Sequence, residues 1–182
     1  TSVTDRDRLW VLIDGSPVDK IVKLNAASGA AVQWLDSTGR ADAPDSDTEG
    51  ITYMDGYLYV VSNKSVGWDT NAYLYKINAA TAAVENTYNL NWTAMMWGEG
   101  GGISNDGTNL IVHKKWDNEI VIISASDGSQ LSMKWTCCDV MQWGSQAVAT
   151  NAERGQIIIG QNKSDVTYPL SHTTVTDKED AQ

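Results

Sequence analysis

Residues 49–63 read EGITYMDGYLYVVSN, in which an Asp-Gly pair separates a mixed stretch from an almost wholly apolar one. An Asp-Gly pair between two such stretches is typical of a tight turn between antiparallel strands. A short apolar run of this kind is typical of a strand buried on both faces. The segment therefore predicts a β-hairpin whose second strand lies in the core.

This apolar stretch occurs four times, starting at Leu9, Leu58, Leu110 and Ile157, which are 49, 52 and 47 residues apart. A second motif of small and polar residues follows the first three copies, at 24–29, 77–82 and 123–128. It predicts a hairpin turn with one left-handed position. The second copy has Ala82 where the others have Gly29 and Gly128, so we expect that turn to be built differently.

Each period of about 50 residues therefore holds four antiparallel strands, which is the spacing of a propeller blade. No segment carries a sustained helical period. We predict an all-β fold, a β-propeller of four-stranded antiparallel blades at about 1–36, 37–90, 91–136 and 137–170. Residues 171–182 are expected to form a polar tail or linker. Three blades are nearly complete and the fourth has its inner strands, so about four blades are seen. They form either a small ring or part of a larger ring whose further blades come from the same precursor or another subunit.

The blade pattern resembles that of the NHL, SMP-30/gluconolactonase, YVTN and quinoprotein-like propellers. The resemblance rests on the segment 49–61 and on the turn at 24–29 followed by Trp34, and it covers most of residues 8–163. The resemblance implies a β-propeller fold. In SMP-30-like hydrolases a Glu near the position of Glu49 or Glu99 helps to hold a catalytic metal, so the resemblance also implies a metal-dependent hydrolase or lactonase as an alternative function.

The chain is acidic, with 13 Lys and Arg against 23 Asp and Glu among 182 residues and a formal net charge of −10. Such a surface repels phosphate backbones, which argues against nucleic acid as a partner. No apolar run approaches the length of about 18 residues that a membrane span needs. An acidic, β-rich chain of this kind is expected outside the cell or at its surface, with the periplasm as another possible compartment.

Tryptophan is concentrated in the expected loops of one blade face, where propellers usually bind their ligands. Five of the 8 Trp residues lie there: Trp68, Trp92, Trp97, Trp116 and Trp143. Indole faces stack on sugars and attract cations, so these residues are candidates for binding a carbohydrate or protein ligand. The alternative is that they pack the bases of the loops, such as the expected loop 63–72.

The densest group of acidic residues lies in the loop before residue 50 and includes Asp45, Asp47 and Glu49. Closely spaced carboxylates suit calcium, and Glu99 stands before the next Gly-rich strand as a fourth candidate ligand. The alternatives are a solvated acidic loop and glutamates that accept backbone N–H groups.

Cys137 and Cys138 are adjacent and are the only cysteines in the chain. Adjacent cysteines can close a strained vicinal disulfide. Two reduced cysteines in a loop are the alternative.

The sequence contains no Gly-Xaa-Ser-Xaa-Gly elbow, phosphate loop or His-rich metal motif. We therefore favour a non-catalytic extracellular or surface module that binds a ligand through its Trp- and acid-rich loop face, with calcium as the one expected cofactor. A metal-dependent hydrolase and a purely structural assembly module remain alternatives.

Overall fold

The computed structural model describes residues 8–13, 20–36, 48–66, 69–92, 100–114, 119–135, 145–151, 156–161 and 172–175. Within these ranges the protein is all-β, as the sequence predicted, and no described helix is long and apolar enough to cross a membrane. The strands form four antiparallel sheets in chain order, which we call the first to the fourth sheet.

The first sheet consists of β1 (Arg8–Ile13), β2 (Lys20–Asn25) and β3 (Ala31–Asp36). The second has β4 (Thr48–Met54), β5 (Tyr57–Val66), β6 (Asp69–Asn78) and β7 (Val84–Asn89). The third has β8 (Gly100–Asn105), β9 (Asn109–Lys114), β10 (Glu119–Ser124) and β11 (Gln130–Trp135). The fourth has β12 (Ser145–Asn151), β13 (Gln156–Gln161) and β14 (His172–Val175).

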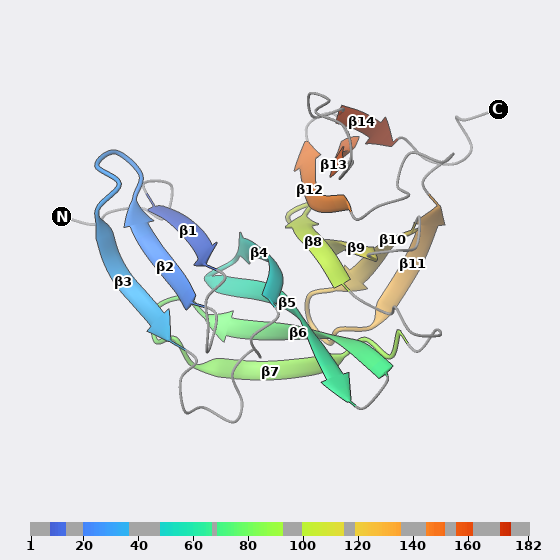
Figure 1. The fold of residues 1–182 in the computed structure, drawn as a ribbon, viewed down its shortest axis with the longest axis horizontal. Helices are drawn as coiled ribbons and strands as arrows, with labels where there is room; N and C mark the ends of the chain where they lie inside the picture. Colours follow the sequence, from blue (N-terminus) through green and yellow to red (C-terminus); the bar gives the residue numbers. More distant parts are fainter. Residues whose placement is uncertain are drawn as a thin grey trace.

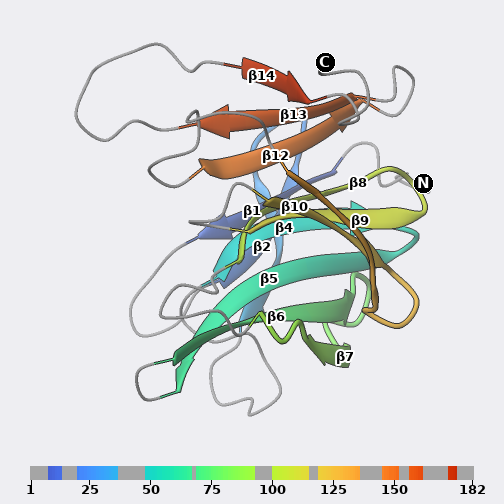
Figure 2. The same ribbon diagram turned by 90° about the vertical axis from the view of Figure 1, so that its right-hand side faces the viewer.

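The sheets follow one another along an arc, with the first and the fourth at its two ends (Figure 1). The view from the side shows the fourth sheet well separated from the outer strands of the second sheet (Figure 2). The inner strands β4, β8 and β12 contact one another in turn. Gly50 of β4 permits this approach, because a Cβ there would lie 2.9 Å from the backbone nitrogen of Ile103 in β8.

One hydrophobic cluster fills each junction between consecutive sheets. The cluster between the first and second sheets includes Ile21, Leu58 and Val60. The largest cluster joins the second and third sheets, and a smaller one joins the third and fourth. The core is therefore divided between three blade junctions, and only the second and third sheets pack between two neighbours.

The three turns between the third and fourth strands of the blades are built alike. Asn25, Asn78 and Ser124 each accept a backbone N–H from the residue two positions later through a side-chain oxygen. In each turn the residue four positions later adopts a positive φ: 70° at Gly29, 63° at Ala82 and 72° at Gly128. The expectation of a different turn in the second blade is therefore wrong. Ala82 adopts the left-handed conformation despite its Cβ.

Two other expectations need correction. The segment 63–72 is largely strand, because β5 and β6 stay paired from Tyr57–Asn78 as far as Val66–Asp69. Within 171–182, for which we expected a polar tail or linker, the structure describes β14, which pairs with β13. Its Thr-Thr-Val sequence has a high β-propensity, so an outer strand can form despite its polarity.

Candidate functional site at the loop end of the second and third sheets

Each sheet has two ends of different character. The short turns between β4 and β5, β6 and β7, β8 and β9, and β10 and β11 lie at one end, which we call the turn end. At the opposite end, the loop end, β5 and β9 finish and β4, β6, β8 and β10 begin. The buried polar side chains of the described residues are all at the loop end: Ser62, Asn63, His113 and Glu119.

A carboxylate and an amide meet at the loop end of the second sheet. Glu49 lies in a bulge of β4, because the pairing with β5 shifts between Thr48 and Gly50. The Nδ2 atom of the buried Asn63 donates a hydrogen bond of 3.4 Å to Oε1 of Glu49. The bulge turns the half-buried Glu49 towards the end of β5, where its carboxylate is held by the amide.

An ion pair lies at the loop end of the third sheet. Lys114 at the end of β9 pairs with Glu119 at the start of β10, with Nζ and Oε2 3.2 Å apart. Only 12% and 9% of the two side chains are exposed. Because desolvating two charges is costly, a pair at this depth is not explained by stability alone.

Trp92 follows β7 near the loop end of the second sheet. Its indole is 7% exposed and belongs to the hydrophobic cluster between the second and third sheets. This placement favours the packing alternative for Trp92, since its ring faces have no room for a stacked ligand in this arrangement.

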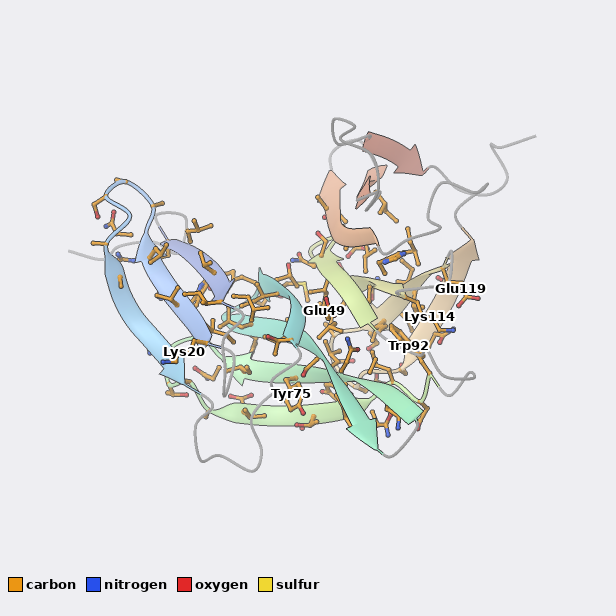
Figure 3. The ribbon with its side chains drawn as sticks, in the orientation of Figure 1. Lys20, Glu49, Tyr75, Trp92, Lys114 and Glu119 are labelled. Atoms are coloured by element: carbon orange, nitrogen blue, oxygen red, sulfur yellow. The ribbon has the colours of Figure 1, made fainter. Side chains whose placement is uncertain are left out.

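Strand alternation brings these residues to one junction. Because side chains alternate along a strand, Asn63 lies on the same face of β5 as Tyr59 and Val61, which pack towards the third sheet. Lys114 lies on the same face of β9 as Leu110 and Val112, which pack towards the second sheet. Figure 3 shows Glu49, Trp92, Lys114 and Glu119 in this part of the molecule, away from Lys20. We call this group the junction site: Glu49, Asn63, Trp92, Lys114 and Glu119.

His113 and Ser62 are buried beside the junction site but point elsewhere. By alternation His113 faces the fourth sheet, and it occupies the position of Val61 in the second sheet. Ser62 faces the first sheet, and its Oγ makes no hydrogen bond to the described part of the chain. Neither adds a charge to the junction site.

The bulge that holds Glu49 in β4 recurs in β8, where it falls between Gly100 and Ile103. The position in β8 that matches Glu49 is therefore Gly101, which carries no carboxylate. The third sheet thus has no acidic side chain at the position of Glu49.

The remaining predicted site residues lie outside the described residues: Trp68, Trp97, Trp116, Trp143, Asp45, Asp47, Glu99, Cys137 and Cys138. In the described ranges, no group of three or more His, Cys, Asp or Glu side chains is placed to hold a metal ion. The donor set of Glu49 and Asn63 alone is too small for a calcium site, which takes six to eight oxygen ligands.

Sequence reasoning missed Lys114 and Glu119. Their signal was present: a Lys ends an apolar strand and a Glu begins the next apolar strand five residues later. In a hairpin with a short connection these two positions face each other, so opposite charges there predict a cross-strand pair.

No family model matches the chain, and no curated protein matches it. Solved structures do resemble it. Hydrazine synthase of Kuenenia stuttgartiensis has a TM-score of 0.61 at 13% identity, over 97% of this chain and 44% of that one. Glutaminyl cyclase of Myxococcus xanthus has a TM-score of 0.58 at 12% identity, over 95% of this chain and 72% of that one.

The WD40 repeats of RRP9 also match, with a TM-score of 0.58 and 14% identity over 86% of this chain. This chain spans 42% of the solved RRP9 WD40-repeat chain and 44% of the hydrazine synthase chain, so it corresponds to part of each. At these identities the likeness concerns the fold alone. Together with the four consecutive antiparallel sheets, it identifies the chain as a β-propeller whose repeating unit is the four-stranded antiparallel blade.

Proposed function

We propose that this protein is a non-catalytic binding module that recognises a carbohydrate ligand at the loop end of its blades, over the junction site. The observation that carries the proposal is the ion pair of Lys114 and Glu119, which is almost buried at a position where the fold does not require charge. The matching pairs are Ser62 with Tyr73 in the second sheet and Ile13 with Lys20 in the first.

The chemistry of the junction site supports this choice of ligand. Sugar hydroxyl groups are bound by carboxylates, amides and ammonium groups that are already held in place. Glu49 is held by Asn63 at 3.4 Å, and Lys114 is held by Glu119 at 3.2 Å. Trp68, Trp97, Trp116 and Trp143 would supply stacking surfaces from the loops, as the sequence suggests.

Calcium and an extracellular location belong to the same proposal. Asp45 and Asp47 directly precede β4 in the sequence, and β4 carries Glu49, so calcium bound by the two aspartates would lie close in sequence to the junction site. Extracellular calcium modules bind with a Kd of about 10⁻⁴–10⁻³ M. We expect a saturable change in Trp fluorescence when calcium is added, and its loss in an Asp45→Asn, Asp47→Asn double variant.

Binding of oligosaccharides tests the main proposal, measured by titration calorimetry after a glycan panel in the presence of calcium. Glu49→Gln removes the charge and keeps the shape, and we expect about tenfold weaker binding, as for the loss of one charge-assisted hydrogen bond. Glu85→Gln is the matched control. Glu85 also accepts a hydrogen bond from an asparagine, Asn78, but it is exposed at the turn end.

Failure of the wild-type chain to bind any oligosaccharide of the panel would overturn the proposal. Equal losses in Glu49→Gln and Glu85→Gln would remove the junction site from it. Hydrolysis of a lactone that depends on a divalent metal and is abolished by Glu49→Gln would replace it with the metal-dependent hydrolase.

A further inference from the structure

The second and third sheets each present one face to the sheet before them and the other to the sheet after them. In β5, Leu58 and Val60 pack towards the first sheet, and in β9 the matching Leu110 and Val112 pack towards the second. We call this side of a sheet its preceding face, and the opposite side its following face. All four of these residues are completely buried, because a neighbouring blade covers each preceding face.

The first sheet has the same preceding face, but it is open along β1. Leu9 occupies the same register position as Leu58 and Leu110. Each of the three pairs with the residue just before the turn to the outermost strand: Leu9 with Leu24, Leu58 with Ile77 and Leu110 with Ile123. Leu9 is 53% exposed, whereas Leu58 and Leu110 are 0% exposed. Ile13, at the other end of β1, is 38% exposed. Val22 on β2 is buried, so the open part of this face is the part along β1.

The fourth sheet, at the other end of the arc, has one described residue exposed on its following face. Thr52 of β4 and Ser104 of β8 lie at the same register position and contact the next inner strand. Asn105 Nδ2 donates to Thr52 Oγ1 at 2.8 Å, and Ser104 Oγ lies 3.1 Å from Thr150 Oγ1. Ala149 occupies this position in β12 and is exposed.

We propose that the preceding face of the first sheet binds the following face of the fourth sheet of a second copy of this chain, head to tail. The contact would continue the three blade junctions already present in the chain, with Leu9 at the register position of the buried Leu58 and Leu110. The two faces lie at the two ends of the arc, so one chain offers both halves of the interface (Figure 1). The interface is heterologous, and it closes into a ring only if the rotations of the copies add up to a full turn.

This inference is independent of the proposed ligand site, which lies at the junction of the second and third sheets. Its first test is the mass of the full chain by sedimentation velocity and light scattering at micromolar concentrations. We expect a dimer or a larger closed assembly for the wild type and a monomer for Leu9→Lys. Ile13→Lys serves as a second variant on the same strand.

Leu131→Lys is the matched control, because Leu131 is 55% exposed on β11 of the third sheet and should leave the mass unchanged. Ala149→Lys should also give a monomer. Mixing Leu9→Lys with Ala149→Lys should restore a dimer, since each variant keeps the face that the other has lost. A monomeric wild type, an unchanged mass for Ala149→Lys, or no dimer in the mixture would overturn the head-to-tail assembly.

Discussion

The second and third sheets share the same hydrogen bonds at their turn ends but carry different side chains at matching positions of their loop ends. At the turn end, the backbone N–H of Ala82 donates to Asn78 and that of Gly128 donates to Ser124, both at 2.9 Å. At the loop end, matching positions hold Ser62 and Lys114, or Val61 and His113.

The difference follows from what each end must satisfy. A tight turn has to pair the same backbone groups in every blade, so its chemistry recurs even where Gly is replaced by Ala. At the loop end the paired strands already satisfy the backbone groups, so the side chains there are free to differ between blades. They can be a carboxylate, a hydroxyl or an ion pair. Residues that break the repeat are therefore candidates for function, and residues that follow it are explained by the fold.

The largest expected effect concerns the turn of the third blade. Gly128 has φ +72°, and a Cβ there would lie 2.4 Å from Cγ of Tyr88 in the second sheet. We expect Gly128→Ala to lower the free energy of unfolding by about 3 kcal/mol, from backbone strain and overpacking together. Urea unfolding of the wild type and of Gly128→Ala measures this difference in the free energy of unfolding.

Gly29→Ala is the control for this prediction, because Gly29 has φ +70° and nothing within 4 Å of the added Cβ. It should cost only about 1 kcal/mol, from the backbone strain alone. Equal losses in the two variants would mean that the contact with Tyr88 does not constrain this turn.

The next effect concerns the ion pair of the loop end. Glu119→Gln removes the carboxylate that lies 3.2 Å from the largely buried Lys114 ammonium, so we expect a loss of about 2 kcal/mol in the free energy of unfolding. The double variant Lys114→Met, Glu119→Gln should lose less than Glu119→Gln, since it also removes the ammonium group. A double variant that is less stable than the single one would show that the pair itself stabilises the fold.

The position that matches Lys114 in the second sheet should respond in the opposite direction. Ser62→Ala removes a buried hydroxyl whose Oγ has no hydrogen bond to the described residues. We expect the free energy of unfolding to rise by about 1 kcal/mol, because the cost of desolvating this hydroxyl disappears. A lower chemical denaturation midpoint for Ser62→Ala would contradict this account.

A smaller gain is expected at Ala82, the alanine with φ 63°. Ala82→Gly relieves the left-handed strain but makes the unfolded chain more flexible, so the net stabilisation should be about 0.5 kcal/mol. Ala80→Gly in the same turn is the control and should not stabilise. A melting temperature that falls in Ala82→Gly would show that the packing of the methyl group outweighs the strain.

The smallest effect is a pH dependence in the third turn. Asp127 accepts hydrogen bonds from the backbone N–H of Ser129 and from nearby Ser hydroxyls, which hold its pKa below the usual 3.8. A lowered folded pKa contributes stability above the unfolded pKa, and this stability is lost as the pH falls through the folded pKa. Below about pH 4, the stability of Asp127→Asn should therefore fall less steeply than that of the wild type, as followed by urea unfolding at several pH values. If the stability of Asp127→Asn and of the wild type fell equally steeply with pH, Asp127 would not be the source of this pH dependence.

The sequence by itself determined the blades. The spacing of the apolar stretches and the Asp-Gly and Ala/Ser turn motifs specify strands and turns through local chemistry, and these are the features that the sheets contain. Local rules also account for Asn25, Asn78 and Ser124, since each bonds to backbone groups within a few residues.

Only the tertiary structure decided which residues meet between blades. The Nδ2 atom of Asn105 in β8 donates to Oγ1 of Thr52 in β4 at 2.8 Å, a contact between two sheets that no local pattern in either strand predicts. The sequence also could not tell that Leu9 is exposed while Leu58 is buried, because the two strands have the same apolar character. Burial in a propeller depends on whether a neighbouring blade covers a face, and that is a property of the packing between sheets that no single strand contains.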